Sequence, residues 1–360
     1  MSSVQTNAQG QRNCEETEGK DLILQVQNLK MYFPVMGGAI TKKVGDLKAV
    51  DDVSFELERG KTMGLVGESG CGKTTIGKCI LRLHRATGGQ ILYNGQDIVK
   101  MSKKDFAKLR REIQIVFQDP LGSLDPRQSV YSTLKETLMI GGKYKTREEV
   151  ERRINELLDA IEVDREYANN YPHELSRGQL QRLGIARALA CDPELVVCDE
   201  PVSALDVSIQ AQVINLLRRM QKEMGLSYIF IAHDISVVYH IADVIAVMYL
   251  GHIMETVESG ELYAHPMHPY TLALLSAVPV PDYDVEQNRK RIVLTGEVPS
   301  PINAPRGCPF HPRCTYATER CRSEVPQLRD MGGGHLVACH NLEQIHHLEP
   351  GQENGRKEPT

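Results

Sequence analysis

The sequence predicts an α/β fold in which a largely parallel sheet is covered on both faces by helices. Short, strongly apolar segments alternate with helical segments in the second half of the chain, as in parallel sheets that are buried on both sides. A glycine-rich loop at 67–75 stands between an apolar strand and a helix. A length of 360 residues with 41% hydrophobic content suffices for one large core and a smaller appendage.

Composition argues against several classes of protein. The net charge is only −5, without a long basic block, so nothing indicates nucleic-acid binding. The first twenty residues are polar and lack the apolar stretch of a signal peptide. The longest apolar run, Val244 to Leu250, is far shorter than the ~18 residues that suggest a membrane span. We therefore expect a soluble, cytoplasmic chain that reaches membranes only through a partner.

The N-terminal part is predicted to be a tail followed by strands. Residues 1–20 are polar and are expected to be a disordered tail. The strands are predicted at 22–33, 47–58 and 61–69, and a helix at 73–84 follows the glycine loop directly. A strand, a glycine loop and a helix in this order are the context that a phosphate-binding loop requires.

The middle of the chain, from about 95 to 190, is predicted to be mostly helical. Thr146 and Glu149 have the spacing of a capping box at a helix start. Apolar strands then return, and helices separate them. The strands are expected at 195–200, 227–233 and 243–251, with helices at 207–224 and 234–242. The helical block is therefore interpreted as an insertion between two halves of one α/β core.

The C-terminal part has a different composition. Beyond about residue 259 the chain is rich in Pro, His and Cys, which indicates a separate appendage at 259–345. The last residues, 346–360, are expected to be a frayed tail.

The glycine loop matches the phosphate-loop pattern Gly67-x4-Gly72-Lys73-Thr74 in full. Glycines let the backbone N–H groups turn inward as an anion nest at the start of the following helix. Lys73 is expected to reach the β- and γ-phosphates of a nucleotide, and Thr74 to bind Mg²⁺. The residues expected to contact nucleotide here are Gly67, Ser69, Gly70, Cys71, Gly72, Lys73, Thr74 and Thr75.

Asp199 and Glu200 end the apolar strand LVVC. The carboxyl end of a parallel strand is where α/β sheets place ligand-binding groups. An unpaired carboxylate behind four apolar residues would be costly, so a functional role is favoured over a surface position. We expect Asp199 to hold Mg²⁺, largely through water, and Glu200 to polarise the attacking water.

Other polar and aromatic residues stand beside predicted strands. His233 ends the strand FIAH and could touch the γ-phosphate and sense its loss. A lone histidine is more often structural, but the position one strand beyond Asp199 favours the functional role. Gln118, in IVFQDP, closes another strand and could contact both magnesium and the lytic water. Phe33 or Tyr32 could stack on adenine, with an ordinary core aromatic as the alternative. The expected catalytic residues are Lys73, Gln118, Glu200 and His233.

With LSRGQ at 175–179 added, the motif set resembles the ATP-binding subunit of an ABC transporter. The resemblance covers about 21–258 and implies a P-loop NTPase core of the ABC ATPase type, with a helical subdomain at about 95–190, that binds and hydrolyses MgATP. The motifs occur in the family's order: Walker A at 67–75, Gln118, the signature at 175–179, Walker B at 195–200, the D-loop at 203–206 and His233.

This resemblance implies a head-to-tail dimer with two nucleotides sandwiched between subunits. Ser176, Gly178 and Gln179, at the start of a helix at 176–190, would face the nucleotide of the opposite subunit, where a helix N-terminus favours an anion. Asp206 would communicate across the same interface. Arg177 stands where the family usually has glycine, and its effect on closure is left open.

Longer stretches resemble the oligopeptide/dipeptide importer subfamily. They include YPHELSRGQLQR, HPYTLALLSAVPVPD at 268–282 and GEVPSPINAPRGCPFHPRC at 296–314, while PVSALDVSIQAQV is similar to the F-type ATPase subunit. The resemblance implies a second, different ATPase as dimer partner, two membrane permeases, an extracytoplasmic solute-binding protein acting indirectly, and a place at the cytoplasmic face of the inner or plasma membrane. Di- or oligopeptides are the expected cargo, and nickel, glutathione or sugar are alternatives within the subfamily.

The appendage contains the spacing Cys308-x5-Cys314-x6-Cys321-x17-Cys339. Four thiolates in a short segment can hold Zn²⁺ or an iron–sulfur cluster. The close C-x2-C pairs of structural zinc sites are missing, so the wider spacing favours a [4Fe–4S] cluster. Similar segments of the subfamily are thought to carry one. Zinc, free thiols and disulfides are the alternatives.

Two readings from other classes compete with the importer. One is a soluble ABC ATPase that acts on DNA or ribosomes, which the lack of a coiled-coil insertion, of tandem halves and of basic patches disfavours. The other is a metal-binding or redox-regulatory module in which ATP only modulates binding. A complete set of catalytic residues disfavours that reading.

Overall fold

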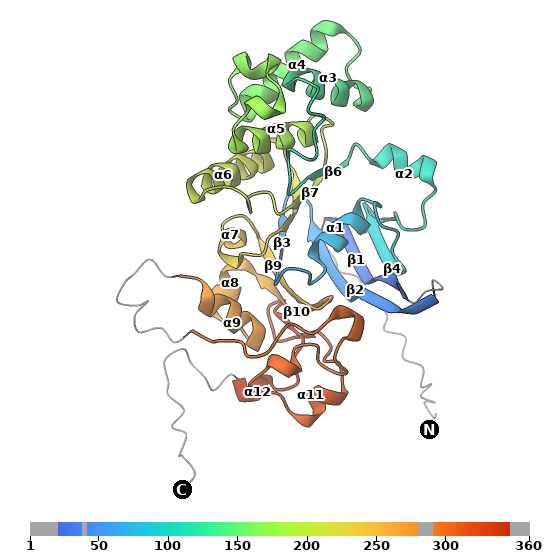
Figure 1. Cartoon of the computed structure of the whole chain (residues 1–360), viewed down its shortest axis with the longest axis vertical. Coiled ribbons are helices and arrows are strands. Elements are labelled where there is room, and N and C mark those ends of the chain that lie inside the picture. The colour runs from blue at the N-terminus through green and yellow to red at the C-terminus, as the bar shows by residue number, and fades with distance from the viewer. Residues whose placement is uncertain (1–20, 38–41, 280–290, 346–360) are drawn as a thin grey trace, which may run out of the picture.

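The computed structural model of the chain describes residues 21–37, 42–279 and 291–345. The tails predicted at 1–20 and 346–360 lie outside the described residues. Helices form one end of the elongated molecule, two sheets the middle, and the C-terminal appendage the other end (Figure 1).

The main sheet has eight strands in the order β11-β12-β10-β9-β3-β8-β7-β6, and the five strands from β9 to β6 run parallel. Every residue of β3, β7 and β8 is buried, which matches the continuous apolar runs of a sheet covered on both faces. The parallel strands are β3 (Thr62–Val66), β6 (Ile113–Val116), β7 (Leu195–Asp199), β8 (Ser227–Ile231) and β9 (Val244–Tyr249); the antiparallel ones are β10 (His252–Glu258), β11 (Arg329–Asp330) and β12 (Leu336–Val337).

A second, antiparallel sheet has the order β2-β1-β4-β5. Its strands are β1 (Leu22–Gly37), β2 (Lys42–Glu58), β4 (Gly88–Tyr93) and β5 (Gln96–Asp97). The pairing of β1 with β2 contains several register shifts, which bend this long ribbon. Buried side chains from this sheet and from β3 share one hydrophobic core, so the two sheets pack as one unit.

The stretch at 95–190 is helical in large part, but it also contains β5 and β6. The strand expected before Gln118 is β6, and its run IQIV pairs with β7. Thr146 and Glu149 form the predicted capping box. The helices of the first half are α1 (Lys73–Ile80), α2 (Lys103–Leu109), α3 (Val130–Gly141), α4 (Arg147–Ala160) and α5 (Arg177–Leu189), with short 3-10 turns at Arg165–Asn169 and Pro172–Glu174.

Helices also cover the second half of the main sheet and shape the appendage. They are α6 (Val207–Met224), α7 (Ile235–Tyr239), α8 (Ser259–Ala264), α9 (Pro269–Ala277), α11 (Glu319–Ser323) and α12 (Leu342–Ile345), with 3-10 turns at Pro301–Asn303 and His311–Arg313.

The appendage joins the core through β12, which pairs with β10, and through one buried carboxylate. Glu255 of β10 is fully buried and accepts hydrogen bonds from the backbone N–H groups of Met267 and His268 and from the His335 ring. Burial lowers the pKa of His268 to about 4, so that imidazole is neutral at physiological pH. The C-terminal region is therefore an extension of the main sheet.

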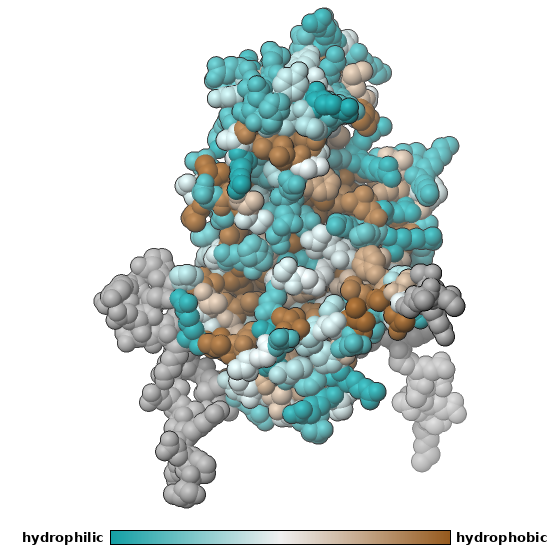
Figure 2. Space-filling view, viewed as in Figure 1, coloured by the Kyte–Doolittle hydropathy of each residue, from teal (hydrophilic) through white to brown (hydrophobic). Residues whose placement is uncertain are grey.

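The visible surface is mainly hydrophilic, with several separate apolar patches (Figure 2). No helix within the described ranges is both long and apolar enough to cross a membrane.

Candidate nucleotide-binding site

The phosphate loop after β3 requires glycine at two positions because the backbone of other segments comes very close. Gly67 has a φ of 149°, and a Cβ there would lie 2.1 Å from the Met248 carbonyl oxygen. Gly72 has a φ of 109°, and its Cβ would lie 2.1 Å from the carbonyl oxygen of Ala49 in β2. Both positions therefore exclude larger residues, and the loop is wedged between β9 and β2.

Lys73 begins α1 and is almost completely buried. Its Nζ atom donates hydrogen bonds to the carbonyl oxygens of Gly67, at 2.7 Å, and Glu68, at 3.0 Å. No side chain caps the N-terminus of α1. The loop therefore offers an ammonium group and uncapped N–H groups at one place, which suits nucleotide phosphates.

Thr74 and Asp199 lie together at the entrance of this loop. The Thr74 hydroxyl donates a 2.7 Å hydrogen bond to Oδ1 of Asp199, at the end of β7. Burial raises the pKa of Asp199, and the bond from Thr74 offsets this only in part. A buried carboxylate beside a hydroxyl is an oxygen donor set that fits Mg²⁺. These residues would hold the ion, as predicted from the sequence.

Glu200, Gln118 and His233 form a second polar group. Glu200 adopts a left-handed backbone conformation with a φ of 47°, and its N–H donates to the Ile231 carbonyl at 3.0 Å. Its carboxylate accepts a 3.0 Å hydrogen bond from Gln118 Nε2 and lies 3.6 Å from His233 Nδ1. The non-glycine residue with positive φ at a strand end is typical of a functional position. The three predicted residues therefore converge at one edge of the sheet.

Of the two aromatic residues considered for adenine, Tyr32 is held by polar contacts with other residues. Its hydroxyl donates to Asp51, and Lys48 lies 5.3 Å from its ring centroid. Phe33 packs edge-on against His84, with ring centroids 5.2 Å apart, and is partly exposed. This arrangement favours Phe33 as the residue that stacks on a base.

The signature segment caps α5. Ser176 accepts a hydrogen bond from the Gln179 N–H at 3.3 Å, and Gln179 Oε1 accepts one from the Ser176 N–H at 2.9 Å. Gly178 lies in the first turn, and a Cβ there would lie 3.0 Å from Ile209. Within the described part of the chain, no hydrogen bond joins these residues to the phosphate loop of the same subunit. The structure therefore does not bring the predicted signature residues together with Lys73.

A cavity of about 460 Å³ lies between the start of the signature helix α5 and the segment that follows β6 at Gln118. Its wall includes Gln118, Arg177 and Ser203, so it joins the glutamine loop, the signature and the D-loop. Arg177 is exposed at this cavity. Asp206, at the end of the D-loop, directly precedes α6; it is exposed, and its side chain caps no N–H group of that helix. Both side chains are therefore available to a second subunit.

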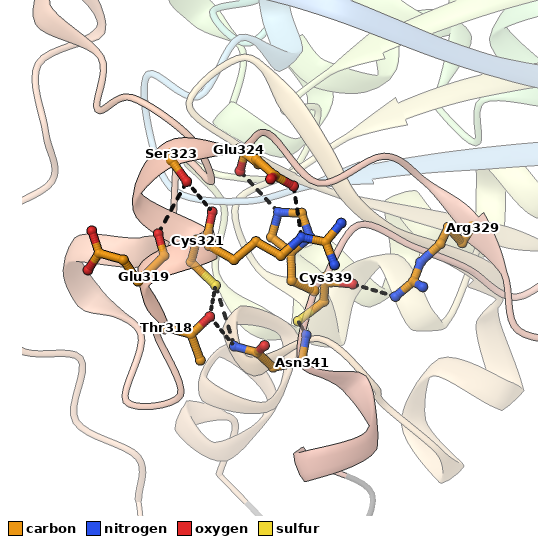
Figure 3. Close-up of polar contacts among 10 residues, drawn as sticks. Thr318, Glu319, Cys321, Ser323, Glu324, Arg329, Cys339 and Asn341 are labelled. Carbon is orange, nitrogen blue, oxygen red and sulfur yellow. Dashed lines mark hydrogen bonds and ion pairs between the residues drawn. The ribbon is translucent and has the colours of Figure 1, made fainter.

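The four C-terminal cysteines are free thiols, close enough for their charges to influence one another. Burial, together with the neighbouring cysteines, raises the pKa of Cys308 to about 12 and of Cys314 to about 11. Asn341 donates from its side chain to Cys321 Sγ and from its backbone N–H to Cys339 Sγ, both at 3.4 Å (Figure 3). Across residues 21–37, 42–279 and 291–345, no set of three or more His, Cys, Asp or Glu side chains has the geometry of a metal site.

Sequence reasoning missed a set of contacts between the loop and the appendage. Arg313 donates to the Glu68 carboxylate, and the Tyr270 hydroxyl accepts from the Glu68 N–H. Glu68 and Arg313 are 245 positions apart, and no local pattern pairs them.

Comparison with known proteins agrees with this geometry. A family model described as "ABC transporter" matches residues 50–203, and one described as "Oligopeptide/dipeptide transporter, C-terminal region" matches residues 254–321. The oligopeptide transport ATP-binding protein AppF of Bacillus subtilis is 52% identical over 322 residues, which cover 89% of this chain and 98% of AppF. OppF of Escherichia coli, also named as an oligopeptide transport ATP-binding protein, is 46% identical and covers 91% of this chain and 99% of its own length.

A solved structure also resembles the core. It is the ATP-binding cassette MJ0796, described as a dimer in a post-hydrolysis state bound to ADP and Pi. It is 27% identical and has a TM-score of 0.58, covering 66% of this chain and 98% of that one.

The sheet, the phosphate loop and the acid pair after β7 define a P-loop ATPase of the ATP-binding cassette class. The chain belongs to the family of ABC transporter ATP-binding proteins that carry the oligopeptide/dipeptide transporter C-terminal region. It is an ATP-hydrolysing transporter subunit for which MgATP is the expected substrate.

Proposed function

We propose that this chain powers an importer of di- or oligopeptides. The observation that supports the cargo best is the full-length similarity to AppF and OppF, which includes the C-terminal region that extends the main sheet through β12. Relatives named for oligopeptide or dipeptide transport favour peptides over the nickel, glutathione and sugar cargoes considered from the sequence.

The site supports hydrolysis by polarisation of a water molecule. The N–H groups of the loop and Lys73 would bind the β- and γ-phosphates. Mg²⁺, held by Thr74, Gln118 and, largely through water, Asp199, would neutralise charge on the phosphates. Glu200 would accept a hydrogen bond from the attacking water while the water oxygen forms the new bond to the γ-phosphorus and the bond from that phosphorus to ADP breaks. His233, beside Glu200, would touch the γ-phosphate and respond to its loss.

Hydrolysis is proposed to occur in a head-to-tail dimer. The separation of the signature segment from the phosphate loop within one subunit supports this, because Ser176, Gly178 and Gln179 are then free to face a partner's nucleotide. We assign the partner as a second, different ATPase, with two permeases that dock near the helical part and the loop after Gln118. A solute-binding protein would act indirectly from the other side. The complex would hold the chain at the cytoplasmic face of the inner or plasma membrane.

The finer proposal for the appendage is a [4Fe–4S] cluster on Cys308, Cys314, Cys321 and Cys339. Four free thiols near one another support it, whereas their present geometry is not that of a formed metal site, so the side chains would have to rotate toward one another. Anaerobic purification followed by iron and zinc analysis tests it. About four irons per chain support the cluster; about one zinc supports the alternative metal, and neither metal overturns the proposal.

The test of the importer is reconstitution of the whole complex. The chain is co-purified with its permeases and second ATPase, and ATP-dependent uptake of labelled di- and tripeptides into proteoliposomes is measured. Nickel, glutathione and disaccharide serve as competing cargoes, and the Glu200→Gln variant serves as the inactive control. Peptide uptake that stops with this variant supports the proposal. Uptake of one of the other solutes without peptide uptake overturns the proposal of a peptide cargo. Co-purification of the chain with ribosomes or DNA, and not with permeases, overturns the proposal of an importer.

A further inference from the structure

Glu68 of the phosphate loop contacts the C-terminal region through two of its groups and Lys73 through a third. Its backbone N–H donates a 2.9 Å hydrogen bond to the hydroxyl of Tyr270 in α9. Its carboxylate accepts from Nη1 of Arg313 at 2.8 and 3.0 Å. Its carbonyl oxygen accepts from Lys73 Nζ at 3.0 Å. One residue beside the anion nest is therefore held by the appendage on one side and touches the phosphate-binding lysine on the other.

The Arg313 side chain is largely buried, so its position is fixed by the residues packed around it. Its side chain is only 8% exposed, and its guanidinium lies 5.9 Å from the ring centroid of Tyr249. It ends the 3-10 turn between Cys308 and Cys314, so the cysteine segment determines where it stands. Removal of Glu68 would leave the Arg313 charge uncompensated in a largely dry place, whereas the Glu68 side chain is 27% exposed.

Aromatic packing holds the same elements together. Tyr249 of β9, Tyr270 of α9 and Phe310 of the cysteine segment are fully buried, and their ring centroids lie 4.9 to 5.3 Å apart. Arg313 and the Tyr270 hydroxyl therefore project from a packed unit toward Glu68, and neither needs to become ordered when nucleotide binds.

Glycine has little conformational preference of its own, so the shape of this loop is set by the groups around it. Gly67, Gly70 and Gly72 all have positive φ; the backbones of β9 and β2 lie close to Gly67 and Gly72, whereas no atom lies within 4 Å of a Cβ placed at Gly70. A binding site made of such backbone gains affinity when neighbouring groups hold it in the bound geometry. Glu68 is the loop residue through which the appendage can do this.

We propose that Arg313 and Tyr270 are positioning residues for ATP: through Glu68 they hold the phosphate loop in its nucleotide-binding conformation, so that nucleotide affinity depends on the C-terminal region. The inference rests on the ATPase activity of the family and not on the peptide cargo. The segment that contains Cys308 and Cys314 would then support the nucleotide site through Arg313, whether or not its cysteines also hold a metal.

A thermodynamic cycle on the full-length protein tests this proposal. The variants are Arg313→Met, which keeps the stem over Tyr249, Glu68→Ala and the double variant. The Kd of a fluorescent ATP analogue with Mg²⁺ is measured, together with KM for ATP and kcat. We expect each single variant to weaken binding about tenfold and to raise KM more than it lowers kcat, with the double variant no weaker than the singles because the pair acts as one unit. Arg313→Lys is expected to recover most of the affinity.

A matched control is available in the same appendage. Arg320 pairs with Glu324 at 2.8 Å in an exposed position, so Arg320→Met is expected to change the Kd less than twofold. Melting of the nucleotide-free protein monitors folding. If Arg313→Met is unfolded at the assay temperature, Tyr270→Phe replaces it, because it removes a single hydroxyl; about threefold weaker binding is expected.

The outcomes separate the proposal from the ATPase assignment. Unchanged affinity in Arg313→Met and Glu68→Ala, or effects that multiply in the double variant, would overturn the positioning role. The Lys73→Ala variant shows what the fluorescence titration looks like when phosphate binding is lost. If the wild-type protein gave the same titration as Lys73→Ala, the ATPase assignment itself would be contradicted.

Discussion

Gln118 donates its side-chain amide to the Glu200 carboxylate at 3.0 Å, although the two residues are 82 positions apart. Gln118 follows β6 and Glu200 follows β7, and these strands are parallel neighbours, so both side chains emerge at the same edge of the sheet. Beside Glu200, Asp199 accepts from Thr74 at the phosphate loop. The strand order therefore brings together, from distant parts of the chain, the side chains that are proposed to hold magnesium and the attacking water.

Replacement of Glu200 by Gln removes the group expected to polarise water while keeping the shape of the side chain. We expect MgATP to bind with nearly unchanged affinity, and kcat for hydrolysis to fall by about 10²- to 10³-fold, because this carboxylate acts in the transition state. The variant is also expected to accumulate as a closed dimer with its partner ATPase, measurable by size-exclusion chromatography with ATP. Glu56→Gln, an exposed residue bonded to Gln25, is the control. Hydrolysis at the wild-type rate by the Glu200 variant would refute the assigned role.

Replacement of Thr74 by Val removes one hydroxyl at constant volume. The bond to Asp199 is lost together with an oxygen ligand for magnesium, and we expect the Mg²⁺ concentration for half-maximal hydrolysis to rise about tenfold. Titration of activity with Mg²⁺ at saturating ATP measures this. Thr137→Val is a matched control, since that hydroxyl only donates to the Thr133 carbonyl in α3. An unchanged magnesium dependence would remove Thr74 from the metal site.

Gly72→Ala tests the close approach of β2 to the phosphate loop. The added Cβ would lie 2.1 Å from the Ala49 carbonyl, so either the loop or β2 must move. We expect a loss of about 2–4 kcal/mol in the free energy of unfolding, together with loss of ATP binding. Gly60→Ala is the control, because Gly60 also has positive φ, at 72°, but has no atom within 4 Å of an added Cβ. It is expected to cost only about 1 kcal/mol, measured by denaturant titration. Equal losses in the two variants would show that backbone strain alone accounts for the effect.

Local patterns in the sequence were sufficient for the parallel strands and the catalytic edge. The apolar runs that became β7, β8 and β9 are short and buried throughout or nearly so, and polar residues that end parallel strands must meet at one edge. The joint positions of Gln118 and Glu200 were therefore predictable. The specific role of each residue stays a prediction until variants are measured.

The pairing of β6 and the contact between the appendage and the phosphate loop could not be predicted from local sequence patterns. A strand before Gln118 was expected from the sequence, but its four-residue length and its pairing with β7 from within a largely helical stretch were not. The bond between Arg313 and Glu68 joins residues at opposite ends of the chain, and charged residues are far too common for such a pair to be chosen from sequence. The contact between the appendage and the phosphate loop could therefore be found only in the three-dimensional structure.

Of the four appendage thiols, Cys314 is expected to be nearly unreactive in the folded, metal-free protein. Cys314 is the least buried of them, and its pKa is raised to about 11, mainly by burial. At pH 8 only about one Cys314 side chain in a thousand is a thiolate, and this fraction grows about tenfold with each pH unit until the pKa is reached. We therefore expect alkylation of Cys314 by iodoacetamide, followed by peptide mass spectrometry, to accelerate about tenfold between pH 8 and 9. Unfolded protein, in which the thiol pKa returns to about 8.5, is the control and should react far faster at pH 8 with a much weaker pH dependence. Equal rates for folded and unfolded protein at pH 8 would show that Cys314 is neither buried nor shifted.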